Sequence, residues 1–180
     1  MKWMIASDIH GSAYYCAQML DAYRRENADR LLLLGDILYH GPRNALPRDY
    51  NPPKVIEQLN EIKNDILCVR GNCDSDVDQM VLQFPIMADY AILTEGKRMI
   101  FATHGHVFHE THLPPLHHGD ILLHGHTHVP VCVNHETYTY LNPGSVAIPK
   151  EDSWHGYMIL ENGLFIWKQL DGSHRLQYAL

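Results

Sequence analysis

The sequence predicts an α/β fold with a parallel sheet at its centre, and three observations support this prediction. Five apolar runs of strand length recur along the chain, each followed by turn-forming and polar residues. Two segments between the first runs have apolar residues at helical spacing. Beyond about residue 90, the helical patterns give way to a series of short strand patterns.

The five runs are continuously apolar rather than alternating, which is typical of strands covered on both faces. In chain order they are WMIAS, LLLLG, ILCVRG, MIFAT and ILLHG, beginning at residues 3, 31, 66, 99 and 121. Because helical segments separate the first three runs, we expect these runs to pair as parallel strands.

Two helices are expected between the first three runs. Residues 12–27, SAYYCAQMLDAYRREN, have near-helical apolar spacing, and Ser12 is a suitable cap. Residues 52–64, PPKVIEQLNEIKN, open with prolines, which are well placed at a helix start. Residues 39–53 are rich in proline and glycine and follow Asp36 closely. This loop should therefore overhang whatever site Asp36 belongs to.

The second half of the chain predicts strands joined mostly by tight turns. The turn signals are EGK, ENG and DGS. We expect this half to form a second sheet stacked on the first. The strand patterns are YAILT, RMIFATH, ILLHG, VPVCVN, TYTYLN, WHGYMILE and LFIWKQL.

Length and composition limit the classes of function. A chain of 180 residues is expected to form one domain, residues 1–180. The net charge of −7 argues against a broad nucleic-acid surface. The first ten residues reach Asp8 too early for a signal peptide, and no apolar run approaches the ~20 residues that span a membrane. The four cysteines are scattered, so we expect a cytoplasmic protein without a disulfide framework.

Polar residues with metal-binding side chains follow each of the five apolar runs. Ligands of an open parallel sheet bind beyond the carboxyl ends of its strands, and neighbouring strands lie only ~4.8 Å apart. Nine of the 14 histidines also fall between His104 and His128. We therefore expect one shared pocket. The residues concerned are Asp8, His10, Asp36, Asn72, His104, His126 and His128.

Carboxylates together with imidazoles suit manganese, zinc or iron. Seven such residues are more than one mononuclear site needs, so two metals ~3.5–4 Å apart with a shared carboxylate fit better. Each residue also has a structural alternative: Asp8 could cap the following helix, Asp36 could be a turn residue, and Asn72 could be a left-handed turn residue. Taken together, these alternatives require five independent coincidences.

The motifs SDIHG, LLGDI, RGNCD, THGH and GHTH, in this order, resemble those of the calcineurin-like metallophosphoesterases. The family pattern is D-x-H, G-D, G-N-[HC]-[DE], H and G-H-x-H. Further stretches, GPRNALP, VDQM and NPGSV, resemble the small bacterial and archaeal branch of YfcE-type phosphodiesterases. The resemblance implies a four-layer α/β sandwich of two stacked mixed β-sheets flanked by α-helices.

The resemblance also implies a division of the ligands between two metals. Asp36 would bridge the two ions, which would most often be manganese, with zinc, iron or magnesium as alternatives. The expected reaction is hydrolysis of small phosphodiesters by a hydroxide that bridges the two metals. The first ion would be held by Asp8, His10, Asp36 and His128, and the second by Asp36, Asn72, His104 and His126.

Other residues are candidates for catalysis or substrate binding. Asp74 could orient or tune an imidazole, and His106 could contact substrate. Cys73 stands where many relatives carry histidine, so a cationic contact is lost, which favours diesters over monoesters; it could equally only fit the turn. Arg43 could grip phosphate oxygens, and His40 could line the site.

Three functions compete at this point: a phosphodiesterase, a nuclease or phosphomonoesterase of the same fold, and a non-catalytic interaction scaffold such as one retromer subunit. The expected partner is a small phosphate ester, with neither nucleic acid nor membrane. Exposed strands in the second half would allow a homo-oligomer. The filled ligand set favours the phosphodiesterase.

Overall fold

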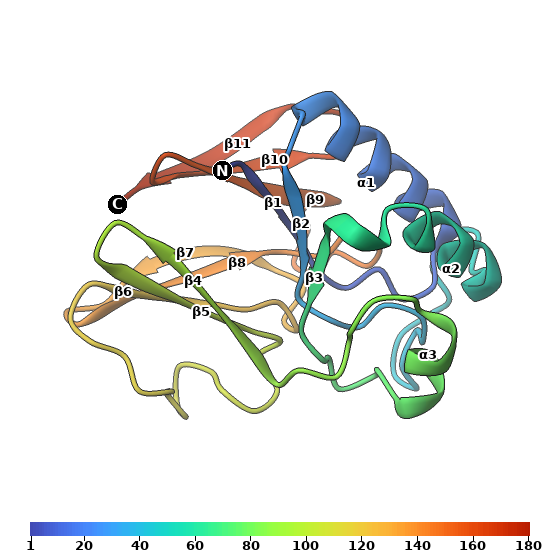
Figure 1. Cartoon of the computed structure of the whole chain (residues 1–180), viewed down its shortest axis with the longest axis horizontal. Helices are drawn as coiled ribbons and strands as arrows, with labels where there is room; N and C mark the ends of the chain where they lie inside the picture. Colours follow the sequence, from blue (N-terminus) through green and yellow to red (C-terminus); the bar gives the residue numbers. More distant parts are fainter.

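The computed structural model describes all 180 residues as two mixed sheets packed face to face, with helices against the first sheet (Figure 1). The first sheet contains β1 (Trp3–Ala6), β2 (Arg30–Leu33), β3 (Ile66–Cys68), β9 (Gly156–Glu161), β10 (Leu164–Gln169) and β11 (His174–Ala179), in the order β11-β10-β9-β1-β2-β3. The second contains β4 (Tyr90–Glu95), β5 (Arg98–Thr103), β6 (Asp120–Leu123), β7 (Pro130–Asn134) and β8 (Tyr138–Pro143), in the order β4-β5-β6-β8-β7.

The central strands are covered on both faces, as their continuous apolarity predicted. β1, β2 and β3 run parallel. Met4 and Ala6 of β1 pack in the core beneath the helices, whereas Ile5 between them packs in the core between the sheets. Because neighbouring side chains point to opposite faces of a sheet, a strand that separates two cores needs apolar residues at every position.

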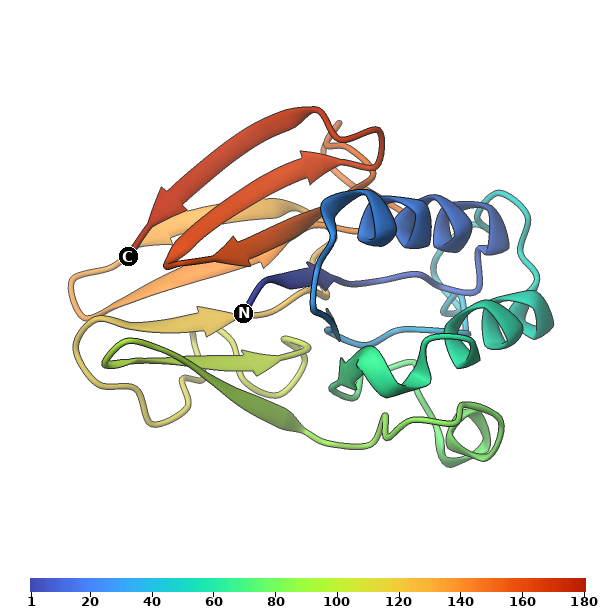
Figure 2. The same ribbon diagram turned by 45° about the horizontal axis from the view of Figure 1, so that its top comes forward.

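Three α-helices accompany the first sheet: α1 (Ala13–Glu26), α2 (Pro52–Asn60) and α3 (Asp76–Val81), with a 3₁₀ turn at Lys63–Asp65. Figure 2 shows α1 and α2 lying side by side. The expected Ser12 cap is confirmed, since its hydroxyl accepts a hydrogen bond from the Tyr15 amide at 3.3 Å. α3 was not predicted from the sequence, because it has only six residues and too few turns to show a periodic pattern.

The expectation that the second half forms a sheet of its own is wrong for its last strands. β9 pairs antiparallel with β1, and β10 and β11 extend the first sheet from there. Only β4 to β8 form the second sheet. Strand patterns indicate which residues are extended but not which neighbour they join, so the sequence could not assign β9 to β1. β11 was missed because its exposed residues make it largely polar.

The outer face of the second sheet is covered by a loop rather than a helix. Phe108 and Leu116, from the connection between β5 and β6, pack against the cluster around Phe101 and Leu122. Figure 1 shows this connection, in yellow, beneath the sheet. The fold is therefore two mixed sheets with flanking helices, with segment 105–119 in place of a fourth helical layer.

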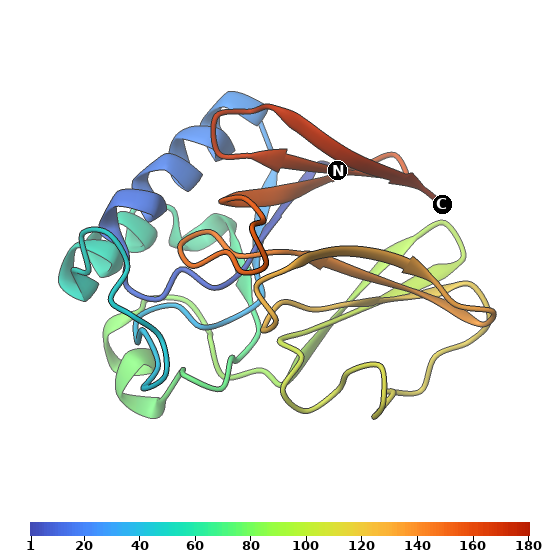
Figure 3. The same cartoon turned by 180° about the vertical axis from the view of Figure 1, so that it is seen from behind.

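The long loop after Asp36 lies at the same end of the molecule as α2 and α3. In Figure 3 it appears in cyan and extends from the level of α2 to that of α3. Its residues 41–44 reach the rim of a cavity at the strand ends. None of the helices combines the length and the apolar composition that crossing a membrane would require.

Candidate metal centre

The structure brings the seven predicted ligand residues together at the carboxyl ends of five strands, β1, β2, β3, β5 and β6. These strands come from both sheets, so the site lies where the two sheets meet. Six of the seven side chains form two adjoining groups of three. The seventh, Asp36, lies near both groups.

The first group is built from β1 and the loop after β6. Asp8 Oδ1 lies 3.2 Å from His128 Nε2 and 3.5 Å from His10 Nε2. The two Nε2 atoms are 3.2 Å apart. All three side chains are almost completely buried.

The second group is built from the loops after β3, β5 and β6. His104 Nε2 lies 3.1 Å from Asn72 Oδ1 and 3.2 Å from His126 Nδ1. Asp36 Oδ2 completes the group at 3.5 Å from His104 Nε2. The same oxygen is 3.6 Å from His10 Nε2 of the first group. A single carboxylate therefore faces both groups.

Backbone carbonyls orient three of the four imidazoles. The Nδ1 atoms of His10, His104 and His128 lie 2.6 to 2.7 Å from the carbonyl oxygens of Tyr39, Leu34 and Ile148. Because a carbonyl can only accept, each Nδ1 carries the hydrogen, and in the neutral ring the Nε2 lone pair points inward.

This inward arrangement fits divalent metal ions. Bare nitrogens and carboxylate oxygens at 3.1 to 3.6 Å repel one another unless a cation lies between them. Asp8 Oδ1 is also a buried oxygen without a hydrogen-bond donor. Carboxylate, amide and imidazole donors in this number are suitable ligands for two borderline or hard ions.

The electrostatics show the same demand for positive charge. Burial acts to raise the pKa of Asp8, but its contacts with His10 and His128 outweigh burial and hold it well below its ordinary value. Burial acts to lower the pKa of His104, but Asp36 and Asp8 outweigh it and raise the pKa to about 9. His126 is affected in the opposite direction, because burial and the nearby His104 lower its pKa to about 4.

Five of these residues adopt a left-handed backbone that side chains other than glycine rarely take. The φ angles are 61° at Asp8, 48° at His10, 56° at Asp36, 66° at His126 and 63° at His128. Such conformations cost about 1–3 kcal/mol each and are concentrated at functional sites. All five residues lie in the turns that follow strand ends, and their side chains meet in the shared pocket.

Two glycines allow the loops to approach closely. A Cβ at Gly71 would collide with the Asp36 carboxylate, and one at Gly125 would collide with Ser7 Oγ and Asp8 Oδ2. The glycines of the G-N and G-H motifs are therefore required by packing against the candidate ligand loops.

Asp74 has a different task from the one expected. Its carboxylate accepts hydrogen bonds from the backbone amides of Asp36 at 2.8 Å, Ile37 at 2.9 Å and Gly71 at 2.7 Å. It orients no imidazole; instead it joins the loop after β2 to the loop after β3. Burial raises its pKa, although these amide contacts oppose the shift.

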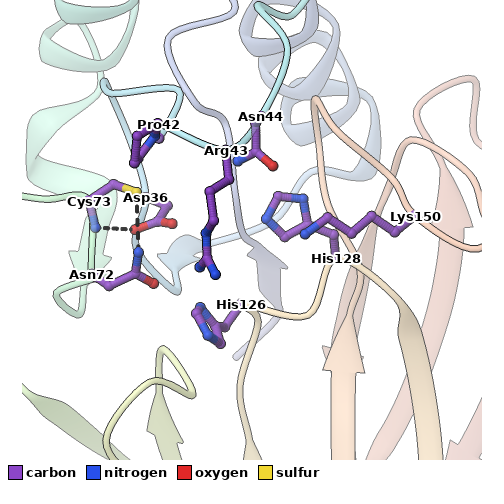
Figure 4. Close-up of a pocket in the computed structure, with 10 residues that line it drawn as sticks. Asp36, Pro42, Arg43, Asn44, Asn72, Cys73, His126, His128 and Lys150 are labelled. Atoms are coloured by element: carbon purple, nitrogen blue, oxygen red, sulfur yellow. Dashed lines mark hydrogen bonds between the residues drawn. The ribbon is translucent and has the colours of Figure 1, made fainter.

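A cavity of about 340 Å³ opens over the two groups. Figure 4 shows Arg43 extending from the overhanging loop between Asp36 and Asn72 on one side and His126 and His128 on the other. Lys150 reaches the cavity beside His128 (Figure 4). Lys150 was not predicted from the sequence, in which only its positive charge indicates a role.

Cys73 also lines this cavity. Its amide donates to Asp36 Oδ1 at 2.8 Å, and its sulfur lies 3.2 Å from Asn72 Nδ2. Burial and the nearby Asp36 carboxylate raise the pKa of the thiol to about 12. The side chain is therefore a neutral thiol.

Two other predicted residues lie elsewhere. His40 is not among the residues that line this cavity, because its ring packs between Tyr39 and Tyr50. The expectation that it lines the site is corrected accordingly. His106 lies behind the ligands, with its ring centroid 5.4 Å from that of His104, and lines a second cavity. Burial and the charge of His104 lower its pKa.

Comparison with known proteins gives one consistent family. The family model described as the calcineurin-like phosphoesterase superfamily domain matches residues 1–163. Phosphodiesterase YfcE of Escherichia coli K12 is 48% identical over 162 residues, covering 90% of this chain and 88% of that protein.

Solved structures agree with this result. The structure of the E. coli phosphoesterase YfcE has a TM-score of 0.96 and 46% identity, covering 99% of both chains. An archaeal phosphodiesterase has a TM-score of 0.61 at 18% identity, covering 100% of both chains. Vps29 from Entamoeba histolytica has a TM-score of 0.63 at 20% identity, covering 100% of this chain and 99% of that one. The last two comparisons concern the fold alone.

Proposed function

The chain belongs to the calcineurin-like phosphoesterase superfamily, and from this premise we propose that it hydrolyses small phosphodiesters with the help of two divalent metal ions. The relative at 48% identity is a phosphodiesterase. The observation that carries the proposal is the position of Asp36, whose Oδ2 faces both His10 and His104 and so links two donor groups.

Manganese is the ion that we propose first. Oxygen donors of Asp8, Asp36 and Asn72 accompany four imidazoles, and such mixed sets suit manganese, zinc or iron. When bound, the ions would supply Lewis-acid activation of water and would offset the charge of the phosphoryl oxygens. The neutral amide of Asn72 limits the negative charge of the ligands, which keeps the ions electrophilic.

The chain itself supplies two cations for the substrate. Arg43 and Lys150 both line the cavity over the donor groups. A guanidinium can hold two phosphate oxygens at once, whereas an ammonium acts as a point charge. Together they would place the phosphate against the ligands and offset its negative charge.

Cys73 supports diesters as the substrate class. Its high pKa leaves a neutral thiol at the position where many relatives have an imidazole. A neutral thiol donates a weak hydrogen bond and offers no positive charge to a dianionic monoester. We therefore propose that the enzyme prefers diesters, and among them esters whose leaving group needs little protonation.

The remaining proposals concern partners and compartment. We propose a small phosphate-ester substrate rather than nucleic acid, because the chain carries a net charge of −7. A cytoplasmic location is supported by four free cysteines, two of them buried. Against a scaffold role, every donor position of the site is filled.

A hydrolysis assay tests this function. The protein is stripped with a chelator and assayed with bis(p-nitrophenyl) phosphate and with p-nitrophenyl phosphate after re-addition of manganese, zinc, iron or magnesium. We expect diester hydrolysis that returns with metal and exceeds monoester hydrolysis. Diester hydrolysis that survives chelation, or that is unchanged in Asp36→Asn, would overturn the proposal.

A further inference from the structure

A second cavity, of about 410 Å³, adjoins the substrate cavity at His126. His126 is the one residue that lines both cavities, so they are neighbours. No hydrophobic side chain lines the second cavity. Its side-chain lining consists of His106, His109, Glu110, Thr111, His124 and Thr127, besides His126.

The wall of this cavity is rigidly built. His124 is 1% exposed, and its ring stacks on Tyr140 with centroids 4.3 Å apart. His124 Nε2 lies 2.9 Å from Glu110 Oε2, and Nδ1 lies 3.0 Å from the carbonyl oxygen of Gly125. Both ring nitrogens therefore have partners within the chain. These contacts fix the orientation of the His124 ring, which in turn positions Glu110 at the cavity.

One side chain in this wall, Glu110, can still accept hydrogen bonds. His124 holds one oxygen of Glu110, whose side chain is 37% exposed, and a carboxylate has about four acceptor positions. The hydrogen bond from His124 lowers the pKa of Glu110, so the group is an ionised acceptor at neutral pH.

The second cavity is placed where it could receive the second ester group of a phosphodiester. A phosphate held over Asp36 and His126 carries two ester groups that diverge from phosphorus. The first cavity, with Arg43 and Lys150, has room for the phosphate and one of these groups. A second ester group that left the phosphate toward His126, the residue common to both cavities, would enter the second cavity. A monoester has no such group.

We propose that this cavity binds one of the two ester groups of the substrate and that this group carries hydroxyls, as in a polyol or a sugar. This inference rests on the proposed diesterase function and names its substrate class. Hydroxyl hydrogens can occupy the free acceptor positions of Glu110, whereas an alkyl group of the same size would displace water from this carboxylate and leave those positions empty. Glu110 is a specificity-determining residue in this account.

The test compares two esters that differ only in the hydroxyls. p-Nitrophenyl glyceryl phosphate and p-nitrophenyl propyl phosphate share the phosphate, the leaving group and the chain length. The variant is Glu110→Gln, whose amide oxygen can still accept from His124. The control is Glu136→Gln, which changes an exposed carboxylate outside both cavities. Any general disturbance of the metal centre affects both esters alike and cancels in the ratio.

For the wild type we expect kcat/KM to favour the glyceryl ester by about tenfold, chiefly through KM. Glu110→Gln should reduce this preference to within about threefold, because a neutral acceptor makes a weaker hydrogen bond than a carboxylate. Glu136→Gln should keep the wild-type preference. Calorimetric Kd values of the non-hydrolysable glyceryl and propyl methylphosphonates should show the same pattern.

Equal affinity and equal kcat/KM for the two esters in the wild type would overturn the inference, as would a preference unchanged in Glu110→Gln. These results leave the diesterase function standing. If the metal-loaded protein hydrolyses neither ester, the proposed function fails, and the phosphonate Kd values still decide whether the cavity prefers hydroxyls.

Discussion

Asp74 lies beneath Asp36 and holds the backbone from which the shared carboxylate projects, with Asp74 Oδ2 accepting the Asp36 amide at 2.8 Å. The same oxygen accepts the Gly71 amide at 2.7 Å, next to Asn72. One buried carboxylate thus fixes two ligand-bearing loops relative to each other. Asp74, which the sequence suggested could orient or tune an imidazole, binds the backbone instead.

Asp74→Asn should weaken both folding and metal binding. The side-chain amide would turn an N–H toward backbone amides that need acceptors, which costs about 1–3 kcal/mol of unfolding free energy. We expect metal affinity to fall about 10–100-fold, as for other groups that support ligands. Urea unfolding and manganese titration measure these effects. Asp76→Asn, on the exposed start of α3, is the matched control and should change neither the stability nor the metal affinity. An unaltered metal affinity in Asp74→Asn would contradict the role of Asp74 in fixing the two loops.

Cys73→Ala should leave diester hydrolysis within about threefold of the wild type. A general acid contributes about 10²–10⁴-fold, but the Cys73 thiol, with a pKa raised by burial to about 12, is poorly suited to give up a proton. The measurement is kcat on bis(p-nitrophenyl) phosphate with saturating manganese. A loss of a hundredfold or more, with metal content unchanged, would show that the thiol takes part in the reaction.

Arg43→Ala and Lys150→Ala should each raise KM for diesters by about tenfold, because each removes a charge-assisted contact to phosphate. Both side chains line the cavity over the ligands. Arg48→Ala is the control, since Arg48 stacks on the ring of Tyr14 outside that cavity. Steady-state kinetics of the three variants measures these effects. If Arg43→Ala and Lys150→Ala both kept the wild-type KM, as Arg48→Ala should, these two residues would not bind the phosphate.

A prediction independent of the site concerns Glu26, which joins α1 to β10. Its carboxylate accepts from Lys168 Nζ at 2.8 and 2.9 Å and from the Tyr157 hydroxyl at 2.8 Å. Burial acts to raise the pKa of Glu26, but the hydrogen bond from Lys168 outweighs it and the pKa is lowered from 4.5.

A lowered pKa in the folded state stabilises the protein above the ordinary value, and this stabilisation is lost as the pH falls through the folded value. Glu26→Gln should therefore lose about 1–3 kcal/mol at pH 7, and the difference from the wild type should shrink below pH 4.5. Urea unfolding at several pH values measures both, with Glu57→Gln on the exposed side of α2 as the control. A difference that persists at low pH would contradict the ion pair as its cause.

The convergence of the candidate ligand residues could be predicted from the sequence because strand ends are local features. Each apolar run stops where a polar residue with a turn-forming neighbour follows, and Asp8 and Asp36 both stand two or three residues beyond a buried strand. Parallel pairing then places these residues at one edge. The left-handed backbone at Asp8 has no sequence signal of its own, and at Asp36 the only one is the preceding Gly35.

What the sequence could not reveal depends on pairing and on side-chain direction. The assignment of β9 to the first sheet follows from its contact with β1, a partner more than 150 residues away. Lys150 and His40 show the second limit. Both residues lie in loops around the site, but only Lys150 lines the cavity. The ring of His40 packs between Tyr39 and Tyr50 instead.

The most direct measurement is a calorimetric titration of the metal-free protein with manganese, together with metal analysis of the product. If Asp36 joins two donor groups, the wild type binds two ions per chain, and Asp36→Ala loses affinity at both sites. Binding of a single ion, or two ions whose affinities are unaffected by Asp36→Ala, would contradict the account.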